Sequence, residues 1–166
     1  MAAKRRDAIR VVLADRNAIV LSGLERTFSD DERFRVVAVA ADGERFLEAV
    51  ERLTFDVGVI GWLMPYLDGR GVLQAMRDRP DGPRMIVYTE DPSPELPRQV
   101  MALGGAGFCP NTAPPEELRD TVAAVASGRM VFPYFDVRTL DTDPFANLTR
   151  RERELLSLLR TGRPAA

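Results

Sequence analysis

Several side chains that could take part in chemistry follow apolar runs of this sequence. Asp15 and Arg16 come directly after the run RVVLA, so a carboxylate stands beside a guanidinium. Thr89 ends the run MIVYT, and Asn111 follows GFCP. Two of them also have a structural interpretation. Asp15 can cap the first loop or pair with Arg16, and Thr89 can hydrogen-bond a nearby backbone group.

The residue types that the chain lacks narrow this chemistry further. There is no histidine, which removes the commonest metal ligand and general base. Of the 23 basic residues only Lys4 is a lysine, so no mechanism that needs a lysine in the body of the domain is available. The single cysteine, Cys109, cannot form an internal disulfide, which fits a reducing compartment.

Apolar runs of strand length alternate with segments of helical periodicity along most of the chain. The expected strands are 10–14, 34–40, 57–60, 85–88 and 107–109. The expected helices are 18–27, 42–52 with Asp42 as its N-cap, 71–77, a short fourth helix that begins near Pro97, and 115–127.

This alternation predicts the fold class. The first four runs are mostly continuous and β-branched, as in strands that are covered on both faces. Alternating strands and helices imply a parallel sheet with right-handed crossovers. We therefore predict a flavodoxin-like α/β fold, a doubly wound sheet with strand order 2-1-3-4-5, over residues 8–128. Residues 129–147 read as a linker whose first half is apolar enough to pack on the domain.

The tail, 148–166, predicts one more helix. Thr149 stands three residues before Glu152, which is the spacing of a capping box. Three leucines then form one apolar stripe, and Gly162 stands where a C-terminal cap is expected.

The segment FDVGVIGWLMPYLDG, 55–69, resembles the third strand and following loop of response regulator receiver domains. In that family an aspartate ends the strand and accepts a phosphoryl group, Met-Pro follows three and four residues later, and Gly follows eight residues later. Counting back from Met64, Pro65 and Gly69 leads to Gly61 each time. The tail resembles the first helix of a LuxR-type helix-turn-helix domain, so the whole chain resembles the NarL/FixJ class of response regulators.

The resemblance implies a phosphorylation pocket that has lost much of its chemistry. In the family, two acidic residues follow strand 1 and bind magnesium with the acceptor aspartate; here the pair is Asp15 and Arg16. The family's strand-4 hydroxyl matches Thr89, its strand-5 aromatic matches Phe108, and its phosphate-contacting lysine matches Asn111. We expect no bound magnesium and no other cofactor. Arg16 could also fill the vacated metal position and hold the site in one state.

These departures predict an atypical, phosphorylation-independent response regulator rather than an enzyme. Its pseudo-receiver would mediate dimerisation and regulate a LuxR-type DNA-binding domain, of which this chain holds only the truncated start at 148–166. Two alternatives stay open: an anionic small molecule could bind in the vacated pocket, or a non-standard residue could accept the phosphoryl group.

The expected partners follow from the same resemblance and from composition. We expect a homodimer, or association with another response regulator, and DNA binding only through a complete C-terminal domain. In the family, receivers dimerise through helices 1 and 5 or through the face of helix 4, strand 5 and helix 5. The net charge of −2 gives no general attraction to nucleic acid, and no apolar stretch reaches the roughly 20 residues that span a bilayer. We expect a cytoplasmic protein without membrane association.

Overall fold

The computed structural model describes residues 7–133, together with Arg151 and Leu155. Its strands are β1 (Ile9–Ala14), β2 (Phe34–Ala40), β3 (Val57–Ile60), β4 (Arg84–Thr89) and β5 (Gly107–Pro110). Its helices are α1 (Ala18–Ser29), α2 (Gly43–Arg52), α3 (Gly69–Met76), α4 (Leu96–Ala102) and α5 (Pro115–Ala126). Each expected strand and helix is therefore present, with ends that differ by one or two residues.

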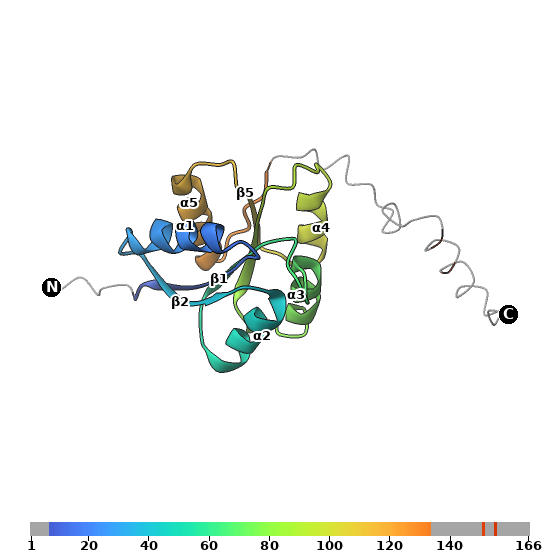
Figure 1. Ribbon diagram of the computed structural model, residues 1–166, viewed down its shortest axis with the longest axis horizontal. Helices are drawn as coiled ribbons and strands as arrows, with labels where there is room; N and C mark the ends of the chain where they lie inside the picture. The colour runs from blue at the N-terminus through green and yellow to red at the C-terminus, as the bar shows by residue number, and fades with distance from the viewer. Residues whose placement is uncertain (1–6, 134–150, 152–154, 156–166) are drawn as a thin grey trace. The chain divides into compact units, whose positions relative to one another are not determined.

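The strands form one parallel sheet in the order β2-β1-β3-β4-β5, which confirms the predicted topology. Helices cover both of its faces, α1 and α5 on one and α2, α3 and α4 on the other (Figure 1). Two apolar cores follow from this layering: Phe28 packs with α5 residues on the first face, and Phe46 packs with α3 and α4 residues on the second.

Side-chain caps decide where three of the helices begin. The Asn17 side chain accepts a hydrogen bond from the Ile19 N–H, and Asp42 caps α2 as predicted, accepting from the Arg45 N–H at 2.8 Å. Asp68 likewise accepts from the Gly71 N–H at 2.8 Å, so α3 begins at Gly69, two residues earlier than expected. The fourth helix is short and has Pro97 in its first turn, as predicted.

The segment after α5 returns to the sheet instead of leaving it. Gly128 ends the helix with a φ of 99°, and Val131 then forms a parallel bridge to Gly107 on β5. The Val131 N–H donates to the Ala106 carbonyl at 3.0 Å, and the Val131 carbonyl accepts from the Phe108 N–H at 2.9 Å. The start of the expected linker thus packs on the domain, as predicted.

Two further predictions concern the tail and the membrane. Arg151 and Leu155 are both helical, whereas Thr149, Glu152 and most of 134–166 lie outside the described residues. Among the helices that are described, none is long and apolar enough to cross a membrane.

Candidate functional site

A cavity of about 280 Å³ opens at the carboxyl ends of β1, β3 and β4, where doubly wound folds bind ligands. The cavity is lined by Asp15, Arg16, Asn17, Val20, Gly61, Trp62, Leu63, Tyr88, Thr89, Glu90, Asp91, Pro92 and Asn111. Five of the six predicted pocket residues therefore line one cavity. The sixth, Phe108, does not: it is 7% exposed and packs in the core of the α2–α4 face.

The Asp15 carboxylate covers Gly61. A Cβ atom built on Gly61 would lie 2.8 Å from Asp15 Oδ2, closer than real side chains approach. The other carboxylate oxygen, Oδ1, accepts a hydrogen bond from the Asn17 N–H at 2.7 Å, which fixes the group at the start of α1. Burial raises the pKa of the Asp15 carboxyl above its usual 3.8. The hydrogen bond from Asn17 and the charge of Arg16 both lower this pKa, but by less than burial raises it. Asp15 thus caps the first loop.

Arg16 is directed towards the opposite side of the cavity. One guanidinium nitrogen lies 3.8 Å from Glu90 Oε1, and both side chains are more than half exposed. An exposed pair at this distance stabilises the fold by less than about 1 kcal/mol. Among the described residues Arg16 forms no ion pair with Asp15, so its partner comes from the loop after β4.

Thr89 and Asn111 are held by the backbone around them. Thr89 is 8% exposed and its hydroxyl oxygen accepts from the Asp91 N–H at 3.2 Å, the kind of structural role predicted for it. The Asn111 N–H donates to the Thr89 carbonyl at 2.9 Å, and the Tyr88 hydroxyl lies 3.5 Å from the Asn111 carbonyl. Burial is also the main reason that the pKa of Tyr88 is raised.

The charge of the cavity differs from what an anion site needs. Three acidic side chains, Asp15, Glu90 and Asp91, and one basic side chain, Arg16, line it, so the formal sum is −3 + 1 = −2. Across the described residues, no group of three or more histidine, cysteine, aspartate or glutamate side chains could hold a metal ion. The net negative charge of the cavity therefore opposes the binding of an anion.

Two further carboxylates that flank Gly61 in the sequence are engaged elsewhere. Asp56 Oδ2 accepts from the Arg10 N–H at 2.8 Å at the amino end of the sheet, and Asp68 caps α3. Neither lines the cavity. The lining residues that the sequence analysis did not assign to the pocket include Tyr88 and Glu90. A signal was present for these two, since they flank Thr89 at the end of β4.

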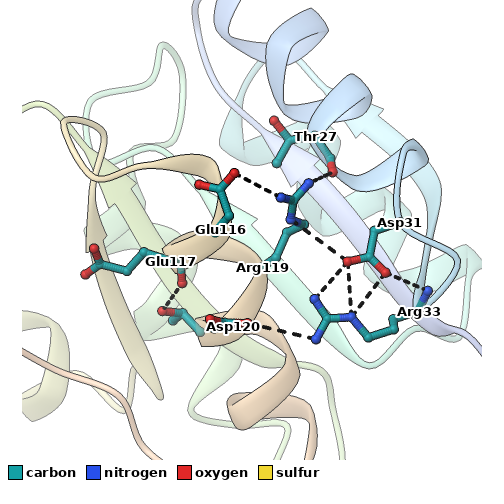
Figure 2. A network of polar contacts seen from close by, with 8 residues as sticks. Thr27, Asp31, Arg33, Glu116, Glu117, Arg119 and Asp120 are labelled. Carbon is teal, nitrogen blue, oxygen red and sulfur yellow. Dashed lines mark hydrogen bonds and ion pairs between the residues drawn. The ribbon is translucent and has the colours of Figure 1, made fainter.

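A second polar cluster joins the end of α1 to α5 (Figure 2). The Arg119 guanidinium donates to the Thr27 carbonyl at 3.3 Å and lies 3.9 Å from Asp31. Asp31 also accepts from Arg33 at 2.8 Å, and this hydrogen bond is the main reason that the pKa of Asp31 is lowered. Arg33 in turn lies 3.9 Å from Asp120 on α5. The sequence pattern does not predict this cluster, because Arg119 lies 92 residues from Thr27 in the chain.

Comparison with known proteins places this geometry in a family. Residues 11–123 match the response regulator receiver domain. The chain is 37% identical over 162 residues to the probable transcriptional regulatory protein SgaR of Hyphomicrobium methylovorum, covering 98% of this chain and 77% of that protein.

Solved structures agree with this match. The receiver domain of the putative response regulator NarL from Mycobacterium tuberculosis is 29% identical with a TM-score of 0.71, over 75% of this chain and all of that one. A structure of two RcsB dimers bound to two parallel DNAs shares the fold, with 24% identity, a TM-score of 0.72, and coverage of 95% of this chain and 79% of that one. The chain therefore belongs to the response regulator receiver family, as a regulatory protein rather than an enzyme, and is related to transcriptional regulators of the NarL and LuxR class.

Proposed function

We propose that this protein is an atypical response regulator whose receiver domain works without aspartyl phosphorylation. The observation that carries the proposal is the position of the Asp15 carboxylate over Gly61, within 2.8 Å of the point where a side chain would begin. The site of the missing acceptor is thus occupied by a neighbouring group that is hydrogen-bonded in place.

The chemistry of phosphoryl transfer supports the same conclusion. Formation of an aspartyl phosphate requires a nucleophilic carboxylate and cationic groups that stabilise the charge of the transferring group. Position 61 has no carboxylate, Asn111 has no charge, and Arg16 is paired with Glu90. A cavity with a formal charge of −2 further opposes the approach of a phosphoryl donor.

In this proposal the receiver domain mediates dimerisation of the protein. We propose that two copies dimerise and set the separation of two LuxR-type DNA-binding domains, of which 148–166, with Thr149 and Glu152, is the beginning. Paired half-sites on DNA require paired modules at a fixed separation. Of the two faces that the family uses, the arrangement favours α1 and α5, since the Arg119 cluster holds these helices together and Val131 already pairs with the edge of β5.

The two alternatives have weaker support. An anionic ligand would enter a cavity with three acidic side chains and one arginine, which is itself paired. A non-standard acceptor would have to be one of the three acidic residues of the cavity, Asp15, Glu90 or Asp91. Asp56 and Asp68 lie outside it. A thermal-shift screen with anionic metabolites tests the first alternative, and phosphoryl transfer to this chain tests the second.

The decisive experiment is the intact mass of the protein after incubation with magnesium and acetyl phosphate. We expect no added phosphoryl group, whereas a receiver domain that keeps its aspartate is modified under the same conditions. The single variant Gly61→Asp should also stay unmodified, because Arg16 and Asn111 remain. The triple variant Gly61→Asp, Arg16→Asp, Asn111→Lys restores the family's set and should gain one phosphoryl group. Modification of the native chain would refute the proposal.

Oligomeric state tests the assembly role separately. Sedimentation equilibrium of the native chain should show a dimer that acetyl phosphate does not change. A monomer at every concentration, or a mixed complex formed only with another response regulator, would contradict homodimerisation while leaving the phosphorylation result intact.

A further inference from the structure

The cavity beside Gly61 holds more negative charge than its neighbours neutralise. Of its three carboxylates, Glu90 forms an ion pair, the 3.8 Å contact with Arg16. Within residues 7–133, neither Asp15 nor Asp91 lies in ion-pair contact with a cationic side chain. A net charge of −2 at the mouth of a crevice attracts cations to it.

Each of these two aspartates is held by one oxygen and leaves the other without a donor. Asp15 Oδ1 accepts from the Asn17 N–H at 2.7 Å, and Asp91 Oδ1 accepts from the Ser93 N–H at 2.9 Å. Within residues 7–133, the Oδ2 atom of neither residue accepts a hydrogen bond. The carboxylates are therefore fixed in orientation, and each retains an oxygen that can accept from a ligand.

Thr89 gives an independent observation at the same cavity. The residue lines the cavity and is 8% exposed, and its hydroxyl oxygen accepts from the Asp91 N–H at 3.2 Å. Among the described residues no acceptor is in hydrogen-bond contact with its own proton. Leaving a buried donor unpaired is unfavourable, so this hydroxyl group calls for an acceptor atom in the cavity.

Apolar side chains complete the lining. Val20, Trp62, Leu63 and Pro92 line the cavity together with the polar residues. An alkyl chain that covers these side chains is favoured in proportion to the apolar area removed from water. An indole ring also attracts a cation that lies over its face.

We propose that this cavity binds an amino alcohol, a short alkyl chain with an ammonium group at one end and a hydroxyl group at the other. The ammonium group would donate to Asp15 and Asp91 in charge-assisted hydrogen bonds. The hydroxyl oxygen of the ligand would accept the proton of Thr89. Such a ligand would connect the end of β1 with the loop after β4. The inference rests on the proposed function, because magnesium and a phosphoryl group at the same place would exclude this ligand.

The fluorescence of Trp62 tests this site directly, because Trp62 is the one tryptophan of the sequence and lines the cavity. The whole chain is titrated at constant ionic strength with 4-amino-1-butanol, butylamine and 1,4-butanediol, and isothermal titration measures the same affinities. We expect the amino alcohol to bind saturably, about threefold or more tighter than butylamine and about tenfold or more tighter than the diol. Absence of saturable binding by the amino alcohol, or equal binding by either of the other probes, would overturn the proposal.

Variants decide whether the probe contacts these side chains. Asp15→Asn and Asp91→Asn should each weaken binding of the amino alcohol by about tenfold, since each removes a charge. Thr89→Val should reduce the affinity for the amino alcohol to that for butylamine, whereas Thr89→Ser should retain the difference. Glu48→Gln, an exposed carboxylate on α2 outside the cavity, is the matched control and should bind as the native chain does.

Equal binding by all of these folded variants would place the probe elsewhere and refute the site. The mass measured after incubation with acetyl phosphate is a separate result. A chain that binds no amino alcohol and gains no phosphoryl group would refute this inference and leave the proposed function intact.

Discussion

The contact between Asp15 and Gly61 can be tested by giving position 61 a single methyl group. In Gly61→Ala, the new Cβ would lie 2.8 Å from Asp15 Oδ2, so the carboxylate must move. The next nearest side-chain atom outside Asp15, Met64 Cγ, is 3.6 Å away, an ordinary contact. The whole steric effect of the substitution therefore falls on Asp15.

Two opposing contributions set the size of the change in unfolding free energy. Gly61 is not in the left-handed region, so alanine should stabilise the protein by about 0.4–1 kcal/mol through the unfolded chain. Displacing the carboxylate breaks its 2.7 Å hydrogen bond with the Asn17 N–H, a loss of about 1 kcal/mol at this partly exposed position. In the native background we expect Gly61→Ala to be neutral or slightly destabilising.

The same substitution should act differently once the carboxylate is gone. In Asp15→Ala the space over position 61 is free, so Gly61→Ala should stabilise that variant by the full amount of about 0.4–1 kcal/mol. The coupling energy of the double-mutant cycle is then about 1 kcal/mol.

Urea denaturation of the four proteins, followed by circular dichroism, measures this cycle. Equal m-values across the set would show that the unfolded state is unchanged and that the midpoints report stability. Additivity to within about 0.3–0.5 kcal/mol would refute the contact between Asp15 and position 61. It would also remove the observation on which the proposed function rests.

Three other predictions concern pH, the helix cluster and the segment after α5. Burial raises the pKa of Asp15, so above that pKa the folded state holds an unfavourable charge; Asp15→Asn should stabilise the protein at pH 7, with the gain vanishing as the pH falls below 3.8. A gain that is independent of pH would contradict this cause. Arg119→Met should destabilise the protein by about 1–3 kcal/mol in urea, whereas Arg26→Met, 85% exposed, should change it by less than about 0.5 kcal/mol. Val131→Pro removes the N–H that donates to Ala106 and should lower the melting temperature; an unchanged melting temperature would show that the bridge contributes nothing.

The sequence was sufficient for the fold because its signals were local. Continuous apolar runs marked the strands, and Asp42 and Pro97 marked two helix starts within one residue. The expected start of α3, residue 71, is two residues late because the Asp68 carboxylate is the N-cap, which the apolar periodicity does not reveal.

The candidate site could be predicted only as a set of positions. The spacing of Met64 and Pro65 from Gly61 identified the pocket, and the structure does gather its polar residues around one cavity. The pairing of Arg16 with Glu90 joins residues 74 apart in the chain, 90 − 16, and the pattern of either segment contains no trace of it. The exclusion of Phe108 from the cavity likewise depends on packing between layers, which only the folded chain determines.

Tyr66 lies in the loop between β3 and α3, where the Leu67 N–H donates to the Pro65 carbonyl at 2.7 Å. Its φ is 64°, a left-handed conformation that costs a residue other than glycine about 1–2 kcal/mol, and its side chain is 84% exposed. Burial of the ring therefore contributes little to the stability of the folded monomer, while the backbone conformation of Tyr66 is strained. Glycine at this position would make the isolated domain more stable. The large apolar area of Tyr66 would lower the free energy only if a second surface covered it.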